Sequence, residues 1–458
     1  MVRFFNKYFP LVFICICVLA LFGRGLFNFF FQDDFNLFTL AWVSSPSELI
    51  KLIAVVPHFP YRPLAFQALS AIELHVFKLN PFTGHLFLFL LHGLNILLLW
   101  KFLTKIVGKK MRLFVSFLYA LSSTHFMSLY WWAVLYMLLG TLFVLLSYQI
   151  LIYSDKKITF SQNILLVVLF FLMVATNEAL IVFPLSVLIF AFFYNKQLIK
   201  KVVFPLFLTF VLLLPLRLLI AKYPQSGDYA IGSVMDFIKT AKWYFLRSLN
   251  LTEGIRAMDP ALQKFLLILL FILFVLFLFA LLSAIGKINK FNWKLFIFGI
   301  YWYLIFAGPF FLLPDHLSPY YLNTALIGFL MSLAAILENI IQRNTVSAKI
   351  FLVSFLVIYG LMSFINVKFL NETHWVVWRS DIARKYIVKT LETYPELPKG
   401  STVLFQNTAV NPSEIAVVLS GEKALRLYYN DPTLNTIYSP DNLNSKNVYL
   451  VSDSEGRR

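Results

Sequence analysis

Charged residues and cysteines are scarce in this sequence. Only 13% of the 458 residues are charged, and the two cysteines, Cys15 and Cys17, both lie in the first apolar run. Residues two apart on a helix point about 200° away from each other, so these thiols provide no disulfide framework. An ordinary soluble protein of this length is excluded, because 60% of the residues are hydrophobic and 51 are Phe. The composition predicts a polytopic membrane protein.

Eleven apolar runs are expected to form membrane-spanning helices. The first covers about 9–31, follows Arg3 and Lys7, and lacks a small-residue cleavage site, so we expect a retained anchor rather than a signal peptide. Polar residues interrupt the apolar segment from 112 to 194 and divide it into four shorter predicted helices. The remaining predicted spans cover 84–104, 202–221, 262–284, 295–313, 320–340 and 350–370.

The loop charges alternate in sign along the chain, as the positive-inside rule requires. Loops assigned to the cytoplasmic side are basic and contain Lys105, Lys109, Lys110, Arg112, Lys156, Lys157, Lys196, Lys200, Lys201, Lys287, Lys290, Lys294, Arg343 and Lys349. Loops assigned to the outer side contain a few bases, such as Arg62, Arg247 and Arg256, and collect the acids Asp33, Asp34, Glu73, Glu178, Glu253, Asp259 and Asp315. Much of the net charge of +17 is therefore explained by basic residues in the cytoplasmic loops and does not indicate a nucleic-acid-binding surface. We expect a multi-pass plasma (inner) membrane protein with a cytoplasmic N-terminus.

The chain changes character after residue 370. WRSDIARKYIVKTLETYPELPKG predicts an amphipathic helix that ends at a Pro/Gly break. STVLFQN, IAVVLSG, ALRLYY and NVYLVSD are short β-prone runs between turn residues. We expect a transmembrane domain over 1–370 and a small extracytoplasmic α/β domain over 371–458.

Two adjacent acids, Asp33 and Asp34, follow the first apolar run in FFFQDDFNLF. A charge within the bilayer costs roughly 2.5 to 3.5 kcal/mol, so an acid pair at its boundary is a candidate functional site, although a helix end in water would also explain it. Adjacent helical residues diverge by about 100°, so one acid is expected to face the site while the other orients it, binds a metal or caps the helix.

Further candidates lie on the same outer side. Arg62 in YRPL offers a fork of donors for phosphate or carboxylate, or for lipid headgroups. His85 shares a helix face with His92, a pattern that favours interhelical hydrogen bonds over catalysis or metal binding. Glu178 is expected to be an acceptor-side acid, a helix cap or an ion-pair partner of an arginine. His316 in LPDHLSPYY is either a ligand contact or incidental.

The order of these segments resembles the membrane glycosyltransferases of the GT-C superfamily, in the bacterial branch related to the protein O-mannosyltransferases and the transmembrane, tetratricopeptide-containing O-mannosyltransferases. The acid pair is followed by YRPL and by NPF-x-x-H leading to His85. LSSTH followed by Trp131 is similar to their HP-x-H...W segment, and TNEA with Pro184 to their S-K-E-x-A...P segment. The likeness covers about the first 200 residues. Met127 replaces an acid, Asn177 replaces a lysine, and no tetratricopeptide repeats follow.

This resemblance implies an enzyme that transfers a sugar, hexosyl or pentosyl, with inversion from a polyprenyl-phosphate donor to a protein, lipid or glycan acceptor. An acceptor hydroxyl needs a base, and Asp33 or Asp34 is expected to supply it, with Asp33 favoured as the first acid. The departing phosphate needs positive charge, from an arginine or a divalent metal. The expected phosphate ligands are Arg62, Arg217 and Arg247. Glu178, His85 and His316 are assigned to the acceptor or a secondary site.

A lipid or glycan flippase or transporter without transferase activity is the alternative function. Such proteins often contain inverted repeats and polar residues at the midplane of the bilayer. This sequence instead gathers its acids at one face and shows no symmetry between its halves. A noncatalytic assembly scaffold is a third interpretation, under which the acid pair would be dispensable.

Overall fold

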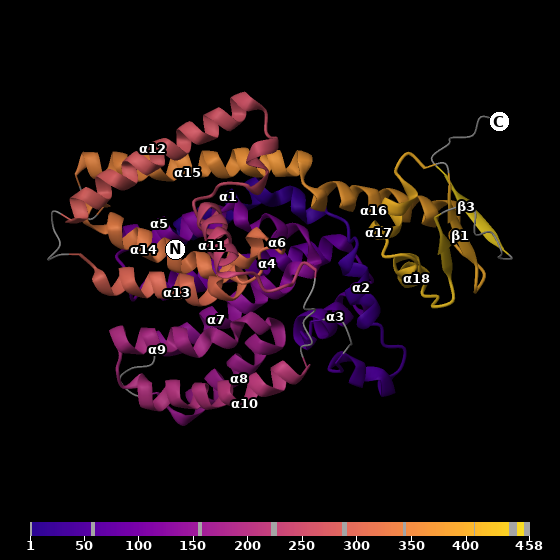
Figure 1. The fold of residues 1–458 in the computed structure, drawn as a ribbon, viewed down its shortest axis with the longest axis horizontal. Helices are drawn as coiled ribbons and strands as arrows, with labels where there is room; N and C mark the ends of the chain where they lie inside the picture. Colours follow the sequence, from indigo (N-terminus) through magenta and orange to yellow (C-terminus); the bar gives the residue numbers. More distant parts are fainter. Residues whose placement is uncertain are drawn as a thin grey trace.

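The computed structural model describes residues 2–55, 60–153, 158–220, 227–285, 291–341, 345–406, 408–438 and 447–452. Within these ranges the chain forms a helical bundle with a small sheet at one end (Figure 1). Helices cover each predicted apolar run. They are α1 (Val2–Phe22), α4 (Pro81–Leu103), α5 (Lys109–Leu121) with α6 (Phe126–Tyr130), α7 (Leu135–Tyr153), α8 (Phe160–Thr176), α9 (Phe183–Tyr194), α10 (Phe204–Ile220), α12 (Pro260–Ile285), α13 (Trp293–Phe311), α14 (Leu322–Ile341) and α15 (Val346–Thr373).

Among the described helices, seven are long and apolar enough to cross a membrane, or eight if the bent pair of α5 and α6 is one span. Two further apolar helices, Phe160–Thr176 and Glu178–Tyr194, are shorter. The chain is therefore a helical, multi-pass membrane protein, as its composition predicts. Burial separates the helices into layers: 89% of the Pro319–Glu338 span is buried but only 22% of Pro260–Ala284, so α14 is central and α12 peripheral.

The close packing of α13 on α14 fixes one wall of the bundle. Gly299 and Gly328 lie at the contact, and a Cβ on either would come within 2.5 to 2.6 Å of the carbonyl oxygen of the other. Small residues allow the two backbones to approach in this way. Trp302 also donates a hydrogen bond from Nε1 to the carbonyl of Thr324, at 2.8 Å. These contacts fix the positions of α13 and α14 and thereby of the turn that connects them.

Short helices gather mainly at the ends of the bundle. They are η1 (Gly23–Phe27), α2 (Asp33–Leu40), η2 (Pro46–Leu52), η3 (Pro63–Ala68), α3 (Leu69–His75), η4 (Ser123–His125), η5 (Trp132–Val134), η6 (Glu178–Val182), η7 (Ile199–Val203), α11 (Val234–Ser248), η8 (Glu253–Ala257) and η10 (Pro319–Tyr321). In Figure 1, α2 and α3 lie at the end nearest the sheet.

The first apolar run does not stay helical to residue 31. Helix α1 ends at Phe22, and Gly23 and Gly25 fall in the following η1 turn. Glycine is unfavourable inside a helix, and Gly25 packs directly against the ring of Tyr130, where a Cβ would approach within 2.7 Å. Asp33 therefore begins a new helix, α2, instead of ending the first one.

The C-terminal segment contains α16 (Trp375–Thr393), α17 (Pro412–Val418), α18 (Lys423–Tyr429) and the strands β1 (Thr402–Phe405), β2 (Asn435–Ile437) and β3 (Val448–Val451). The sheet is parallel in the order β2-β1-β3, with Val403 paired to Thr436 and Tyr449. Helix α16 is the predicted amphipathic helix. It follows α15 after a single residue, His374, whose side chain accepts a hydrogen bond from the Val376 amide and caps α16.

Two of the four β-prone runs are helices, so that prediction was wrong for IAVVLSG and ALRLYY. Asn411 caps α17 by accepting a hydrogen bond from Ser413, and Pro412 occupies its first turn. These start signals outweigh the weak strand preference of a short apolar run. Helix α18 ends at Asn430, which adopts the left-handed conformation common at helix C-termini. The outer two runs are β1 and β3, as predicted.

Candidate active site

Asp34 braces the backbone from inside the protein. Its side chain is fully buried, with Oδ1 accepting a hydrogen bond from the Ala133 amide at 2.8 Å and Oδ2 from the Phe31 amide at 3.1 Å. Burial raises the pKa of Asp34 well above its ordinary value, and these two amide bonds oppose the rise. Both oxygens are occupied, so Asp34 joins α2 to η5 and is poorly placed to accept a proton from a substrate.

Asp33 is the acid of the pair that faces outward. It is only partly buried, and its Oδ1 accepts one side-chain hydrogen bond, from Asn36 Nδ2 at 3.3 Å. Burial raises the pKa of Asp33, whereas the Asn36 bond and the positive charges of Arg379 and Lys423 lower it. A raised pKa makes the carboxylate a stronger base, and its second oxygen has no hydrogen-bond partner among the described residues.

Arg62 and Glu178 form a buried bidentate ion pair. Nε and Nη2 of Arg62 each lie 2.6 Å from a different oxygen of Glu178. The guanidinium also lies over the ring of Tyr136, 3.8 Å from its centroid, and 5.0 Å from that of Phe66. The ion pair is one of the three roles that the sequence left open for Glu178, and Arg62 is held in one orientation by it.

Tyr229 lies within electrostatic range of the acid of α2 and of this ion pair. The pKa of the Tyr229 phenol is raised to about 12, chiefly by burial, with smaller contributions from Tyr136, Asp33 and Glu178 and an opposing one from Arg62. Helix α2 also packs against η3, the helix that follows Arg62. Asp33, Arg62 and Glu178 come from three separate segments of the chain and lie in the same region of the protein.

His316 belongs to the same cluster. Its ring stacks on Tyr229 with 4.3 Å between centroids, and its Nε2 lies 3.3 Å from the hydroxyl of Tyr320. Burial lowers the pKa of His316, Asp228 raises it and Arg62 lowers it further. A neutral His316 at pH 7 is able to accept as well as donate a hydrogen bond. The cluster of Asp33, Arg62, Glu178, Tyr229 and His316 is called the outer cluster below.

Arg247 lies elsewhere, near the end of α11. It donates from Nη1 to the carbonyl of Leu251 at 3.3 Å and covers the ring of Trp243, while its Nε has no hydrogen-bond partner within the described residues. Burial lowers the pKa of Arg247 to about 10, and the charge of Glu253 opposes this. It lines a small pocket of 10 Å³ with Thr252. A buried cation without a carboxylate in hydrogen-bond contact is suited to an anionic ligand.

A large apolar cavity adjoins the same helix. Its volume is 650 Å³, and it lies between α11, α12, α13, α14 and α15. Phe245 and Ser248 of α11 line it together with Leu270, Tyr303 and Phe329. Its lining is almost entirely hydrocarbon, so its natural contents are apolar.

Two further sequence candidates are not in the outer cluster. Arg217 falls in the last turn of α10, but its side chain lies outside the described residues. His85 is fully buried in α4, with Nδ1 2.8 Å from the carbonyl of Pro81 and Nε2 3.2 Å from that of Tyr130. Both ring nitrogens face backbone, which is the interhelical role that the sequence favoured. His92 and His125 are in contact in the interior, with ring centroids 4.5 Å apart and the rings tilted by 53°.

A metal finds no evident set of ligands in the part of the chain that the structure describes. No group of three or more His, Cys, Asp and Glu side chains there is arranged to hold an ion. Asp34 points away from Asp33 into backbone amides, so the two acids do not act as a ligand pair. The described residues therefore offer a divalent metal no set of ligands.

Three residues of the site neighbourhood were not found from the sequence. Arg379, Lys423 and Tyr229 act electrostatically on or near Asp33, but two of them come from the C-terminal segment, some 350 residues away. For Arg379 and Lys423 the only signal in the sequence was their positive charge, and for Tyr229 there was none. Patterns in a single sequence do not show that residues so far apart in the chain lie close together in the fold.

Comparisons with known proteins give a structural likeness but no match in sequence. No protein-family model and no curated protein sequence matches the chain. The solved structure of the archaeal oligosaccharyltransferase AglB from Archaeoglobus fulgidus, in complex with an inhibitory peptide and a dolichol-phosphate, is similar with a TM-score of 0.46 and 14% identity. The match covers 95% of this chain and 65% of that one, so this chain spans less than two thirds of AglB.

Proposed function

We propose that this protein is a glycosyltransferase of the GT-C type that moves a sugar, hexosyl or pentosyl, from a polyprenyl-phosphate donor to an acceptor at the outer face of the plasma membrane. The observation that carries this proposal is the outer cluster. It combines an acid, Asp33, one oxygen of which has no hydrogen-bond partner among the described residues, with a fixed arginine, Arg62, and both lie within electrostatic range of the Tyr229 phenol. Base and phosphate ligand are the two groups that this reaction requires.

In the proposed reaction Asp33 takes the proton of an acceptor hydroxyl as its oxygen attacks the anomeric carbon. The bond from that carbon to the donor phosphate breaks, and its electron pair leaves with the phosphate oxygen. A single displacement of this kind inverts the anomeric configuration. The proton stays on Asp33 until it passes to water. Burial raises the pKa of Asp33 and so makes its carboxylate a stronger base than an exposed one.

Arg62 is assigned to the departing phosphate. Its Nε and Nη2 are used by Glu178, and within the described residues its hydrogen bonds come only from these two nitrogens, which leaves Nη1 for a ligand. Glu178 fixes the guanidinium plane so that little conformational entropy is lost when the phosphate binds. Glu178 therefore supports Arg62, and His316 and Tyr229 are placed to bind the hydroxyls of the sugar or acceptor.

The lipid chain of the donor is assigned to the 650 Å³ cavity. It lies among helices that span the membrane, and Arg247, whose Nε has no hydrogen-bond partner among the described residues, follows Phe245 on the same helix. Hydrocarbon in the cavity and an anion at Arg247 match the two parts of a lipid phosphate. We propose that Arg247 contacts the phosphate of the donor as it enters, before the phosphate reaches Arg62.

The test is direct transfer by the purified full chain in lipid nanodiscs. Synthetic polyprenyl monophosphates carrying a labelled hexose or pentose are supplied with protein, lipid and glycan acceptor fractions. We expect free polyprenyl phosphate and labelled acceptor in equal amounts, with inverted anomeric configuration by NMR. Donors that stay intact but cross the bilayer of sealed vesicles containing the protein would support the flippase alternative and contradict the proposal.

A further inference from the structure

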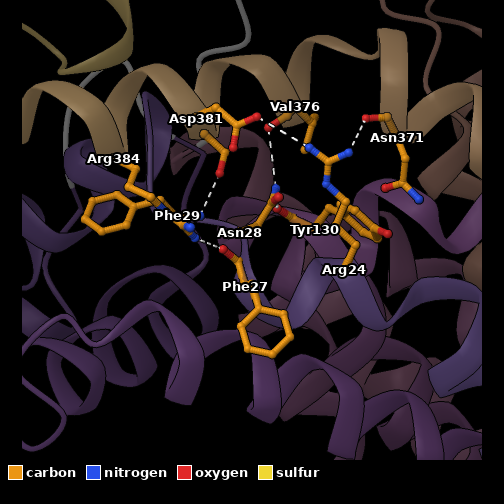
Figure 2. A network of polar contacts seen from close by, with 10 residues as sticks. Arg24, Phe27, Asn28, Phe29, Tyr130, Asn371, Val376, Asp381 and Arg384 are labelled. Carbon is orange, nitrogen blue, oxygen red and sulfur yellow. Dashed lines mark hydrogen bonds and ion pairs between the residues drawn. The ribbon is translucent and has the colours of Figure 1, made fainter.

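The segment that leads from α1 to Asp33 lies along the C-terminal segment. Figure 2 shows Arg24, Phe27, Asn28 and Phe29 beneath α16, joined to it by dashed contacts. These contacts involve backbone or side-chain atoms of four of the six residues from 24 to 29. They are Arg24 Nη1 to the Asn371 carbonyl at 2.7 Å, Arg24 to Asp381 at 3.4 Å, Arg384 to the Phe27 carbonyl, Asn28 Nδ2 to the Val376 carbonyl at 3.5 Å, and the Phe29 amide to Ser380 Oγ at 2.6 Å.

Gln32, the residue before Asp33, is held by the same segment in an unusual conformation. Its φ is +50°, a region that residues with a Cβ rarely adopt unless their surroundings impose it. Its amide donates to the Val418 carbonyl at 2.7 Å, and its carbonyl accepts from Ser420 Oγ at 2.6 Å. Its side-chain Oε1 accepts from Arg379 Nη1 at 2.8 Å. The partners belong to α16, to the end of α17 and to the turn that follows α17.

Arg379 is itself fixed. Its Nε pairs with Glu414 of α17 at 2.7 Å, and its guanidinium lies 5.3 Å from the ring centroid of Trp375 and 5.2 Å from that of Trp378. Lys423 of α18 donates to Asn36 Oδ1 at 2.7 Å, and Asn36 in turn donates to Asp33. Two cations of the C-terminal segment therefore reach the acid, one through Gln32 and one through Asn36.

We propose that the C-terminal segment positions Asp33 for proton transfer, with Arg379 as a positioning residue that holds Gln32 at positive φ and with Lys423 acting through Asn36. The proposal rests on the proposed function only where it treats Asp33 as the base. The geometric part, that α16 and α17 fix the backbone at Gln32, stands on the contacts alone. Removal of the Arg379 contact with Gln32 would let Gln32 relax and turn the Asp33 carboxylate away from the outer cluster.

The charges that face Asp33 make the proposal sensitive to pH. They are Asp34 on its own helix, Arg379 on α16, Lys423 on α18 and the phenol of Tyr229. Both cations favour the ionised carboxylate, so loss of either raises the pKa of Asp33. A base must be ionised to act, so the acid limb of the pH profile of kcat/KM then moves to higher pH.

The first measurement is hydrogen–deuterium exchange of the full chain in nanodiscs, which needs no substrate. In Arg379→Met we expect the Gln32 amide and its neighbours to exchange about tenfold faster than in the wild type. The matched control is Asp381→Asn, on the same helix, whose ion pair with Arg24 is exposed and lies away from Gln32. It is expected to leave exchange at Gln32 unchanged. Equal exchange in Arg379→Met and the wild type overturns the proposal.

The second measurement is the rate of transfer from the labelled polyprenyl-phosphate sugars. Arg379→Met is expected to lower kcat about tenfold with little change of KM, and to move the acid limb upward. Arg379→Lys keeps the charge but loses the fork, so kcat falls while the midpoint of the acid limb stays. Lys423→Met moves the midpoint, and Lys399→Met, at an exposed lysine of the same segment, does not.

The two measurements separate the possible failures. Faster exchange at Gln32 without any transfer by the wild type would contradict the proposed function and leave the positioning contacts standing. Transfer by the wild type with an unchanged kcat and pH midpoint in both Arg379→Met and Lys423→Met would contradict the positioning of Asp33.

Discussion

Arg62 and Glu178 are 116 positions apart in the chain and form a buried ion pair with two hydrogen bonds of 2.6 Å. The pair joins the loop before η3 to the start of η6. Only 9% of the Arg62 side chain and 14% of that of Glu178 are exposed, so neither charge is well solvated. This ion pair fixes the orientation of Arg62, the proposed phosphate ligand of the outer cluster.

Glu178→Gln is expected to destabilise the protein by about 3 kcal/mol, because it leaves the Arg62 charge buried without its partner. Thermal unfolding in nanodiscs measures the loss. Arg62→Met combined with Glu178→Gln serves as the control, since removing both charges leaves none uncompensated. We expect the double variant to be more stable than Glu178→Gln alone. Additive losses would show that the two side chains do not act as a pair.

Asp34→Asn is expected to cost about 1 to 3 kcal/mol of stability, because one of the two carboxylate oxygens becomes an amide that cannot accept a backbone hydrogen bond. The measurement is the unfolding temperature. Asp33→Asn provides the comparison, because the partly buried Asp33 makes only one side-chain hydrogen bond among the described residues. The unfolding temperature of this variant is expected to lie within a degree or two of that of the wild type. Equal destabilisation by both variants would contradict the assignment of Asp34 as the brace.

Glu73 makes stability depend on pH. Burial raises its pKa to about 7, and its Oε1 accepts a hydrogen bond from Thr83 at 3.2 Å. A carboxyl group whose pKa is raised in the folded state contributes stability below its unfolded pKa, near 4.5, and loses it as the pH rises through 7.

Glu73→Gln removes this dependence. Relative to the wild type, the variant is expected to gain about 2 kcal/mol between pH 5 and pH 8, measured by thermal unfolding at both values. Glu48→Gln, at a partly exposed carboxylate, is the control and is expected to show no such gain. A constant difference between Glu73→Gln and the wild type at both pH values would contradict a raised pKa.

Leu270→Trp fills part of the 650 Å³ cavity from α12. If the lipid chain of the donor lies there, the variant is expected to raise KM for a long-chain donor about tenfold, corresponding to the loss of roughly two buried methylene groups. A donor with a short chain is expected to be used as by the wild type. Leu278→Trp, on the same helix but facing outward, is the control. Equal effects on long-chain and short-chain donors would place the lipid elsewhere.

Local patterns were sufficient to predict the membrane helices and the difference between the two acids. Apolar runs of spanning length became helices, because an uninterrupted hydrocarbon surface leaves few alternatives in a bilayer. Adjacent helical residues diverge by about 100°, and Asp34 indeed turns into the protein while Asp33 faces out. The ion pair of Glu178 was among the stated alternatives, although the sequence could not select it.

Long-range features were beyond reach of such patterns. The contacts of Arg379 and Ser420 with Gln32 join parts of the chain separated by more than 340 positions. IAVVLSG became α17 because of the cap at Asn411 and Pro412, which lies before the run and not within it. The first apolar run broke at Gly23 because Gly25 packs on Tyr130, a tertiary contact. These outcomes are set by packing partners that no local pattern reveals.

The role of Asp33 as the base is tested by comparing the rates at which the wild type and Asp33→Asn transfer labelled sugar from polyprenyl phosphate. The account predicts transfer by the wild type and a loss of about 10²-fold to 10⁴-fold in kcat for Asp33→Asn, with the unfolding temperature preserved. A fully active, normally folded Asp33→Asn protein would contradict it.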